Sequence, residues 1–270
     1  MISVSTEYMD IGRIAESGQC FRMERAADER SYEIVAGSRM VRATPADGEY
    51  LLDCDENTFN AFWKDYFDLG TDYSAFTDRI DRNDSYLTAA VKCGGGIRIL
   101  RQDPWEMIVS FLISQQNNIK RIRRCISNIS EKYGRKMARS DGSVYYAFPE
   151  PEPLAVLDED ALMECNLGYR SKYVVRAARD VCEGRFAPDS LTEMSCEQAR
   201  EALLRLYGVG EKVADCICLF GLHHLSAFPV DTHIKQALAR EYPDGFPFER
   251  YKGFEGVIQQ YIFNYELVRK

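Results

Sequence analysis

Short apolar runs alternate with polar turns over the first 95 residues, a pattern typical of antiparallel strands. Strand-like runs cover residues 31–37 and 40–43, and a third covers residues 50–52. The pairs Gly37-Ser38 and Asp47-Gly48 supply turns between them. Residues 58–69 predict a helix, because aromatic residues recur there near helical spacing. We therefore expect a small mixed α/β domain over residues 1–95, ending at the glycines of residues 94–96.

From Pro104 onward the apolar positions follow a helical period. Asp103 and Pro104 fit the cap and the first position of a helix. Further helices are predicted over residues 117–133, 171–183 and 196–207, and a glycine follows each of them, as at many helix ends. The sequence thus predicts an α+β fold, in which a small antiparallel-sheet α/β domain precedes an all-helical domain over residues 96–270.

Composition limits the classes of protein to which the chain can belong. Hydrophobic residues make up 46% of its 270 residues, enough for a sizeable core. No apolar run reaches the roughly 18 residues of a membrane span, and the N-terminus lacks the basic and apolar regions of a signal peptide. We therefore expect a cytoplasmic location and no contact with a membrane. We also expect a monomer.

The nine cysteines are odd in number and scattered, which favours reduced thiols over a disulfide framework. Cys216 and Cys218 point to different faces of a helix, so we expect no shared zinc or iron–sulfur site. We expect no catalytic metal and no cofactor, and a structural cation held by carbonyls of the turn near residues 208–210 stays open. The net charge of −8 argues weakly against nucleic-acid binding, because phosphate contacts need Lys and Arg. Net charge does not report distribution, however, and residues 117–133 carry a local group of basic side chains: Lys120, Arg121, Arg123 and Arg124.

Residues 206–215 predict a helical hairpin, because one helix ends, two glycines turn the chain and a second helix begins. Gly208 and Gly210 allow a positive φ and a close approach of the backbone to another molecule. The free N–H groups of the second helix, as far as Val213, suit a phosphate. The pattern is typical of a helix–hairpin–helix that holds a DNA backbone, and the alternative is an ordinary helix–turn–helix corner.

One residue within this hairpin and one that follows it later in the sequence carry candidate chemistry. Lys212 lies in the first turn of the second helix, where the helix dipole disfavours a cation and favours a nucleophilic free amine. Asp231 fits the N-cap of a helix over residues 232–240, and an apolar run before it indicates a buried edge. An ionised carboxylate there would stabilise the oxocarbenium-like charge of a breaking glycosidic bond. The alternatives are a solvated lysine and an aspartate that only caps its helix.

Residues 208–219, together with Pro229-Val230-Asp231-Thr232-His233, resemble the helix–hairpin–helix DNA glycosylase superfamily, and most of all its 8-oxoguanine DNA glycosylase/AP lyase family. The resemblance extends over nearly the whole chain. It implies that Lys212 is the Schiff-base nucleophile and Asp231 the essential carboxylate. Monofunctional relatives lack the lysine, so a lyase step is implied as well. The implied activity is excision of 8-oxoguanine from double-stranded DNA, followed by nicking of the abasic site.

The resemblance also implies a base-binding pocket. Gly18, within residues 17–22, matches the glycine whose carbonyl reads the N7 hydrogen of oxidised guanine. Cys216 and Phe263 match the residues that lie on opposite sides of the flipped base, and Gln259 matches the residue that bonds the base edge. Taken alone, Gly18 would be interpreted as a turn glycine and Phe263 as core packing.

Further DNA contacts follow from the same resemblance. The segment Gln116-Asn117-Asn118 is similar to the asparagine-rich segment that fills the gap left by the flipped base; since Gln116 replaces a third asparagine, the filling residue is Gln116 or Asn117. Arg121 and Arg170 match readers of the orphaned cytosine, although Arg121 is alternatively one more exposed charge on a basic helix. Tyr169 matches a wedge, and His233 is a phosphate contact or a packed histidine.

Three other functions remain open from the sequence. One is a glycosylase for another damaged base, and a second is a helix–hairpin–helix protein that binds DNA without catalysis. The third is a helical scaffold without any role on DNA, which only the net charge of −8 favours.

Overall fold

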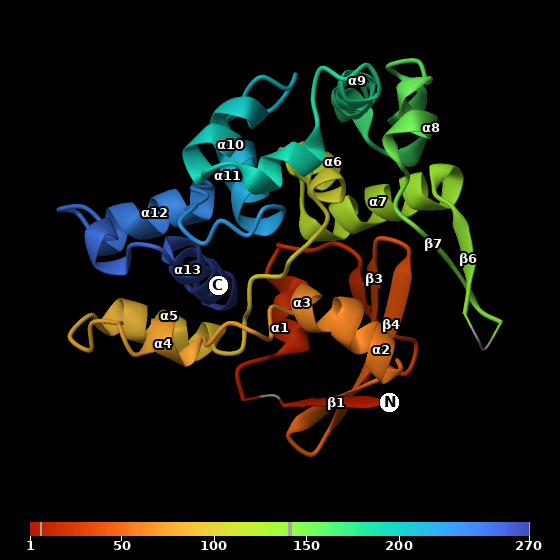
Figure 1. Ribbon diagram of the computed structural model, residues 1–270. Coiled ribbons are helices and arrows are strands. Elements are labelled where there is room, and N and C mark those ends of the chain that lie inside the picture. Colours follow the sequence, from red (N-terminus) through yellow and green to blue (C-terminus); the bar gives the residue numbers. More distant parts are fainter. Residues whose placement is uncertain (6, 140–141, 270) are drawn as a thin grey trace.

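The computed structural model describes residues 1–5, 7–139 and 142–269. Its N-terminal part contains a five-stranded antiparallel sheet with the strand order β1-β5-β4-β3-β2 (Figure 1). The strands are β1 (Ile2–Ser5), β2 (Met23–Arg25), β3 (Tyr32–Ala36), β4 (Arg39–Ala46) and β5 (Glu49–Leu52). The three predicted strands correspond to β3, β4 and β5. The prediction missed β1 and β2, the short strands at the two edges of the sheet.

One face of this sheet packs against helices. They are α1 (Ile11–Glu16), α2 (Glu56–Thr58), the π-helical turn η1 (Phe59–Trp63) and α3 (Lys64–Tyr66). The helix predicted over residues 58–69 is therefore present, with a π-helical turn within it. Trp63 and Phe67 lie in the same core as Ile34 of β3 and Val41 of β4, and all four are fully buried.

The rest of the chain is mainly helical. Its helices are α4 (Ser74–Thr77), α5 (Ser85–Gly94), α6 (Pro104–Ser114), α7 (Ile119–Tyr133), α8 (Pro151–Ala155), α9 (Ser171–Cys182), α10 (Cys196–Leu203), α11 (Glu211–Phe220), α12 (Thr232–Glu241) and α13 (Glu255–Val268). Single 3-10 turns are η2 (Ala161–Cys165), η3 (Gly168–Arg170), η4 (Pro188–Glu193) and η5 (Phe248–Tyr251), and β6 (Lys136–Ala138) pairs with β7 (Val144–Tyr146). The predicted α+β fold class is confirmed.

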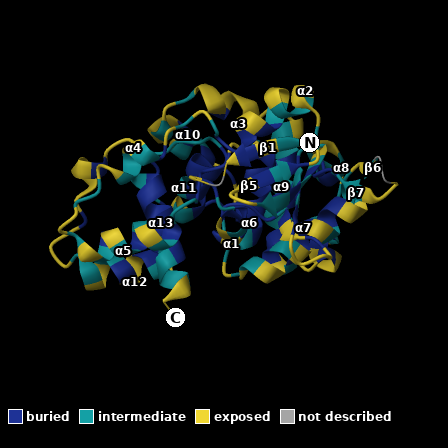
Figure 2. Cartoon of the chain, turned by 90° about the horizontal axis from the view of Figure 1, so that it is seen from below, coloured by how far each residue is buried: buried dark blue, intermediate teal, exposed yellow. Residues whose placement is uncertain are grey.

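Helix α6 lies at the centre of the helical part, where the residues from Trp105 to Ile113 are all buried (Figure 2). Its cap is the predicted one, since Asp103 Oδ1 accepts a hydrogen bond from Glu106 N at 2.7 Å. Helix α7 begins two residues later than predicted, because Asn118 caps it by accepting from Arg121 N at 2.9 Å. Helix α10 ends at Leu203, four residues before the predicted end, where the chain turns into the hairpin.

The glycines at residues 94–96 form a tight junction, as the sequence indicates. Gly94 ends α5 against α13, so closely that an added Cβ would lie 3.0 Å from Tyr261 Cα. Gly96 has a φ of 90°, and an added Cβ would lie 3.0 Å from Asp10 N. Helix α5 packs on α13 within the helical core. A domain boundary after residue 95 stays a prediction.

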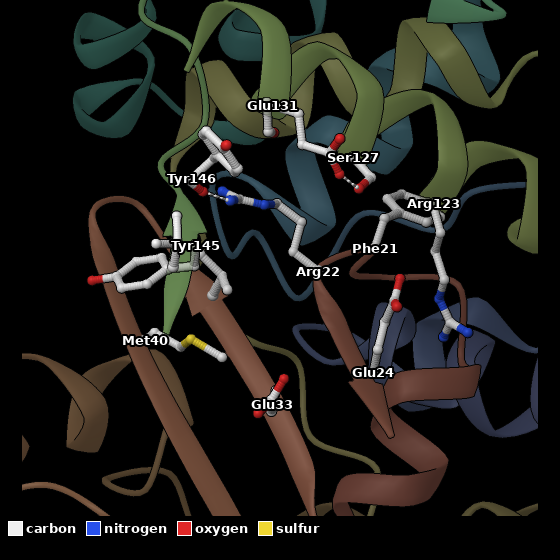
Figure 3. A pocket seen from close by; sticks show the side chains of 13 residues that line it. Phe21, Arg22, Glu24, Glu33, Met40, Arg123, Ser127, Glu131, Tyr145 and Tyr146 are labelled. Carbon is white, nitrogen blue, oxygen red and sulfur yellow. Dashed lines mark hydrogen bonds between the residues drawn. The ribbon is translucent and has the colours of Figure 1, made fainter. Parts of the chain in front are cut away.

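A cavity of about 280 Å³ lies between the sheet and α7, beside the β6–β7 hairpin (Figure 3). Arg22 crosses it and donates a hydrogen bond to the carbonyl of Tyr146. Glu24 and Glu33 line it from the sheet, and Arg123 lines it from α7. None of the residues to which the resemblance assigns a catalytic, base-binding or DNA-contacting role lines this cavity.

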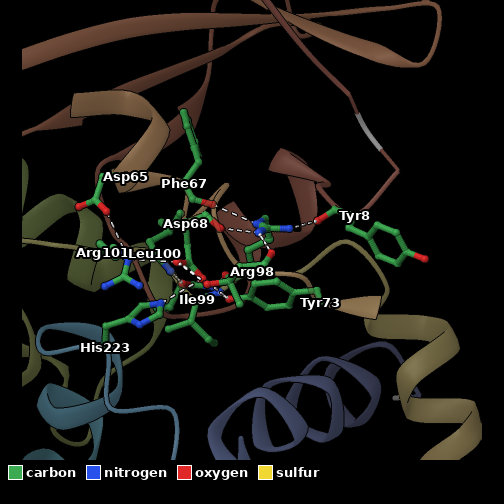
Figure 4. A network of polar contacts seen from close by, with 12 residues as sticks. Tyr8, Asp65, Phe67, Asp68, Tyr73, Arg98, Ile99, Leu100, Arg101 and His223 are labelled. Atoms are coloured by element: carbon green, nitrogen blue, oxygen red, sulfur yellow. Dashed lines mark hydrogen bonds and ion pairs between the residues drawn. The ribbon is translucent and has the colours of Figure 1, made fainter. Parts of the chain in front are cut away.

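A polar network joins the N-terminal part to the loop that follows α11 (Figure 4). Its centre is the buried carboxylate of Asp68. Arg101 Nε and Tyr73 Oη each lie 3.0 Å from an oxygen of this carboxylate, and His223 Nε2 from the loop lies 3.2 Å away. The neighbouring Arg98 guanidinium stacks on Tyr73 at 4.1 Å and donates to backbone carbonyls. The network therefore fixes the end of α11 to the first part of the chain.

We expect Asp68→Asn to lower the free energy of unfolding by about 2 kcal/mol at neutral pH, because it removes the buried carboxylate to which Arg101, Tyr73 and His223 are bonded. Burial raises the pKa of Asp68, but hydrogen bonds from His223 and Thr71 and the charge of Arg101 together hold it below its ordinary value. Such a carboxyl stabilises the fold above its unfolded-state pKa of about 3.9 and loses this contribution as the pH falls through the folded-state value.

The measurement is urea unfolding of both proteins from about pH 7 down to about pH 3. The difference in unfolding free energy should be largest at neutral pH and shrink towards acid. A difference that does not change with pH would show that Asp68 acts through packing rather than through its charge.

Candidate active site

A small pocket of about 60 Å³ opens where α11, α13 and the start of α12 meet the segment after α1. It contains all six residues that the sequence predicted as catalytic or substrate-binding: Lys212, Asp231, Gly18, Cys216, Gln259 and Phe263. Five further residues line it: Ser17, Phe111, Phe220, Pro229 and Gln260. Segments that lie more than 200 residues apart in the sequence thus converge on one site.

Lys212 reaches the pocket from the first turn of α11. Its Nζ lies 5.7 Å from the centre of the Phe111 ring. Cys216 follows one turn later and is buried. Burial raises the pKa of the Cys216 thiol, and the nearby Lys212 opposes this shift only in part. Cys216 therefore remains a neutral thiol at neutral pH.

Asp231 caps α12, as its sequence context predicts. Its Oδ1 accepts a hydrogen bond from Ile234 N at 2.8 Å, and its backbone is extended. The same side chain lines the pocket. The cap fixes the direction of the carboxylate. The pocket therefore holds an oriented carboxylate and the side chain of Lys212.

Gly18 and Phe263 form one wall of the pocket. Gly18 has a φ of 74°, a conformation that side chains disfavour, and an added Cβ would lie 3.5 Å from the Phe263 ring. His233 lies edge-on to Phe263, with the ring centres 6.4 Å apart. The sequence left His233 as a phosphate contact or a packed histidine, and the structure places its ring against the pocket wall.

Gln259 and Gln260 lie side by side at the base of the pocket, and both are buried. Gln259 Nε2 donates to the carbonyl of Pro229 at 2.9 Å, and Gln260 Nε2 donates to Gln259 Oε1 at 3.1 Å. A role in the pocket was predicted for Gln259 but not for Gln260, Pro229 or Phe111, which line it as well. The two adjacent glutamines of this helix were the available signal, since glutamine side chains are mostly exposed.

The hairpin has the predicted conformation. Gly208 has a φ of 91°, and an added Cβ would lie 2.6 Å from the ring of Tyr173, so only glycine fits. Gly210 is the N-cap of α11 and, unlike Asp231, supplies no side-chain hydrogen bond. The Val213 side chain is buried, so only the backbone of this residue is available for a contact with another molecule. The first N–H groups of α11 are thus left for an anion such as a phosphate.

Between α6 and α7, the side chains of Gln116, Asn117 and Asn118 differ in their exposure and hydrogen bonds. Gln116 is exposed and has a left-handed φ of 47°. The Asn117 side chain turns back and donates to the Ile113 carbonyl at 3.0 Å, while Asn118 is occupied as the α7 cap. Gln116 is therefore the side chain of the three that projects from the surface without a capping role.

The two arginines assigned to the orphaned cytosine lie in different environments. Arg170 is only 3% exposed, and it donates to the carbonyls of Gln115 and Gln116 at 2.7 and 2.9 Å. Arg121 is exposed on α7. Tyr169 is 44% exposed and is supported by the Arg170 guanidinium, 4.6 Å from its ring centre. Arg170 thus holds the turn and the candidate wedge in place, while Arg121 remains accessible.

Within residues 1–5, 7–139 and 142–269, none of the helices has the length and the apolar composition of a membrane span. In the same ranges, no group of three or more His, Cys, Asp or Glu residues could hold a metal ion.

Comparison with known families covers most of the chain. Residues 1–108 match the model described as 8-oxoguanine DNA glycosylase, N-terminal domain, and residues 109–244 match the HhH-GPD superfamily base excision DNA repair protein model. A crystal structure of the Clostridium acetobutylicum 8-oxoguanine glycosylase/lyase, with double-stranded DNA containing cytosine opposite 8-oxoG, is 35% identical with a TM-score of 0.90. The match covers 97% of this chain and 93% of that one. The chain belongs to the 8-oxoguanine DNA glycosylase/AP lyase family.

Curated relatives of this family give a consistent result. The N-glycosylase/DNA lyase of Saccharomyces cerevisiae is 40% identical over 54% of this chain and 42% of its own length. The N-glycosylase/DNA lyase OGG1 of Arabidopsis thaliana is 30% identical over 82% of this chain and 62% of its own length. The chain thus matches less than two thirds of the length of these two N-glycosylase/DNA lyase relatives. The resemblance found in the sequence is confirmed at the level of the family.

Proposed function

We propose that this protein is a bifunctional DNA glycosylase that flips and excises 8-oxoguanine, preferably opposite cytosine, and then nicks the abasic site by β-elimination. The observation that carries the proposal is the convergence of Lys212 and Asp231 in one pocket with Gly18, Cys216 and Phe263. The Saccharomyces cerevisiae relative, an N-glycosylase/DNA lyase, and the Clostridium acetobutylicum structure with 8-oxoG support the same activity.

The chemistry follows from an amine and a carboxylate in one pocket. The Lys212 amine attacks C1′ of the extruded nucleotide as the glycosidic bond breaks, and the base leaves with the bonding pair and takes up a proton. Asp231 stabilises the positive charge that develops on the sugar. Opening of the sugar ring gives a Schiff base between Lys212 and C1′. Loss of a C2′ proton then expels the 3′ phosphate, and water releases the lysine.

Recognition of the duplex uses groups around the pocket. The N–H groups after Gly210 and the exposed basic side chains of α7 suit phosphates. We assign to Gln116 the role of filling the gap left by the flipped base, because Gln116 is exposed while the Asn117 amide is bonded to the Ile113 carbonyl of α6. Tyr169 is the wedge, since it is exposed and its ring is held by Arg170. Extrusion costs a few kcal/mol, least for a damaged base.

All six residues assigned to catalysis and base binding line a pocket formed by one chain, which supports a monomer that acts on double-stranded DNA containing oxidised guanine. All nine cysteines are free thiols. Free thiols are typical of a reducing compartment and support a cytoplasmic location.

Reduction with borohydride tests the proposed function. Wild-type protein should form a covalent adduct with duplexes that contain 8-oxoguanine, because borohydride reduces the Schiff base to a stable amine. The four opposite bases and duplexes with alkylated purine or oxidised pyrimidine are compared in parallel. An adduct preferred with another lesion would favour a different glycosylase, and salt-sensitive binding without any adduct would favour a non-catalytic DNA-binding protein.

We expect Arg121→Ala to flatten the preference for cytosine opposite the lesion by about tenfold, because an arginine that pairs with a base edge contributes about 1–3 kcal/mol of discrimination. The measurement is the ratio of single-turnover excision rates opposite cytosine and opposite adenine. Arg124→Ala removes an exposed arginine from the same helix and is the control for general phosphate attraction. If the ratio survives in Arg121→Ala, another group reads the orphaned base.

A further inference from the structure

Gln260 places a buried hydrogen-bond acceptor, its Oε1, in the lining of the pocket. Gln259 and Gln260 are 3% and 2% exposed, and both line the pocket. Within the part of the chain that the structure describes, Gln260 Oε1 has no hydrogen-bond partner. A buried polar atom without a partner costs about 1–3 kcal/mol. An amide retained at this cost inside a pocket indicates a role in that pocket.

The orientation of both amides follows from the carbonyl of Pro229. A carbonyl only accepts, so Gln259 must direct its Nε2 towards Pro229, and the observed distance is 2.9 Å. The Oε1 of Gln259 then faces Gln260, which must present its own Nε2, at 3.1 Å. Reversing either amide would set two acceptors or two donors against each other. The hydrogen bonds thus run in one direction, from Gln260 through Gln259 to Pro229.

This direction leaves a defined set of groups on Gln259. One of its two Nε2 hydrogens and one lone pair of Oε1 are unused. A guanine-type base carries a hydrogen on ring N1, which can bond to that lone pair, and an oxygen at position 6, which can accept the Nε2 hydrogen. An adenine-type base in the same position would place a bare N1 against Oε1 and an amino group against Nε2. The fixed amide therefore favours one kind of base edge.

We propose that Gln260 is a positioning residue that locks the amide of Gln259 so that the pocket accepts a guanine-type edge and rejects an adenine-type edge. This inference rests on the proposed glycosylase function. Gln260 acts through Gln259 and need not touch the base. In this proposal Gly18 recognises the oxidised five-membered ring of the base, and Gln259, held by Gln260, recognises the edge of its six-membered ring.

The test compares excision of 8-oxoguanine with excision of 8-oxoadenine, which share the oxidised five-membered ring and differ in the edge. Each rate is divided by the rate of borohydride trapping on a preformed abasic site, where no base remains to be read. Gln260→Leu removes the donor to Gln259 together with the unpartnered acceptor. Asn264→Leu is the matched control, because it removes a buried amide from the same helix outside the pocket.

Gln260→Leu is expected to lower the preference for 8-oxoguanine over 8-oxoadenine by about fivefold to tenfold, the effect of one hydrogen bond. Asn264→Leu should retain the wild-type ratio. Gln260→Glu places an acceptor against Gln259 Oε1 and should lower the preference further. A wild-type ratio in both Gln260 variants that melt like the wild type would overturn the inference. A wild-type protein that traps neither lesion would instead overturn the proposed function.

Discussion

Replacing Lys212 with glutamine should abolish both strand cleavage and borohydride trapping on 8-oxoguanine duplexes, with a loss on the order of 10³-fold or more. Lys212 is the residue that brings an amine into the pocket, and the neighbouring Cys216 has a raised pKa and stays protonated. Glutamine keeps a polar side chain of similar length but has no basic nitrogen. Single-turnover cleavage and trapping are measured with the lesion opposite cytosine.

Two measurements separate lost chemistry from lost binding. Duplex affinity of Lys212→Gln should stay within a few-fold of the wild type, because the phosphate contacts come from the hairpin N–H groups and from α7. Lys252→Gln removes an exposed lysine outside the pocket and should leave cleavage unchanged. Cleavage at the wild-type rate in Lys212→Gln would exclude this residue as the nucleophile.

The local positions of Lys212 and Asp231 were predictable from the sequence because each is set by the start of its own helix. Two glycines separated by one residue define the hairpin and place Lys212 in the first turn of α11. Asp231 is a good N-cap residue immediately before α12, and the structure shows that cap. That the two helices bring these residues into one pocket could be taken only from the resemblance, because it depends on tertiary packing.

Other features depend on contacts between distant segments, which the sequence does not display. Arg170 occupies the position of a base reader, yet its guanidinium is used by carbonyls more than 50 residues earlier in the chain. The role of Gln260 depends on the Pro229 carbonyl, which fixes the Gln259 amide from about 30 residues away. Strands β1 and β2 were missed for a related reason, since short edge strands are defined by their partners rather than by their own pattern.

Asp231 combines two roles that one substitution can separate. Asparagine caps helices about as well as aspartate does. Asp231→Asn should therefore retain the hydrogen bond from Ile234 N and leave the melting temperature nearly unchanged. The same substitution removes the negative charge from the pocket. Any loss of rate in this variant then reports the charge and not the cap.

We expect the excision rate of Asp231→Asn to fall about 10²–10³-fold, the usual effect of removing one group that stabilises transition-state charge. Asp55→Asn, at a capping aspartate of α2 outside the pocket, is the matched control and should keep the wild-type rate. Trapping on a preformed abasic site should fall less than excision, because the glycosidic bond is already broken there. Equal losses on the two substrates would mean that Asp231 acts mainly after the base has left, and an unchanged excision rate would reduce it to a helix cap.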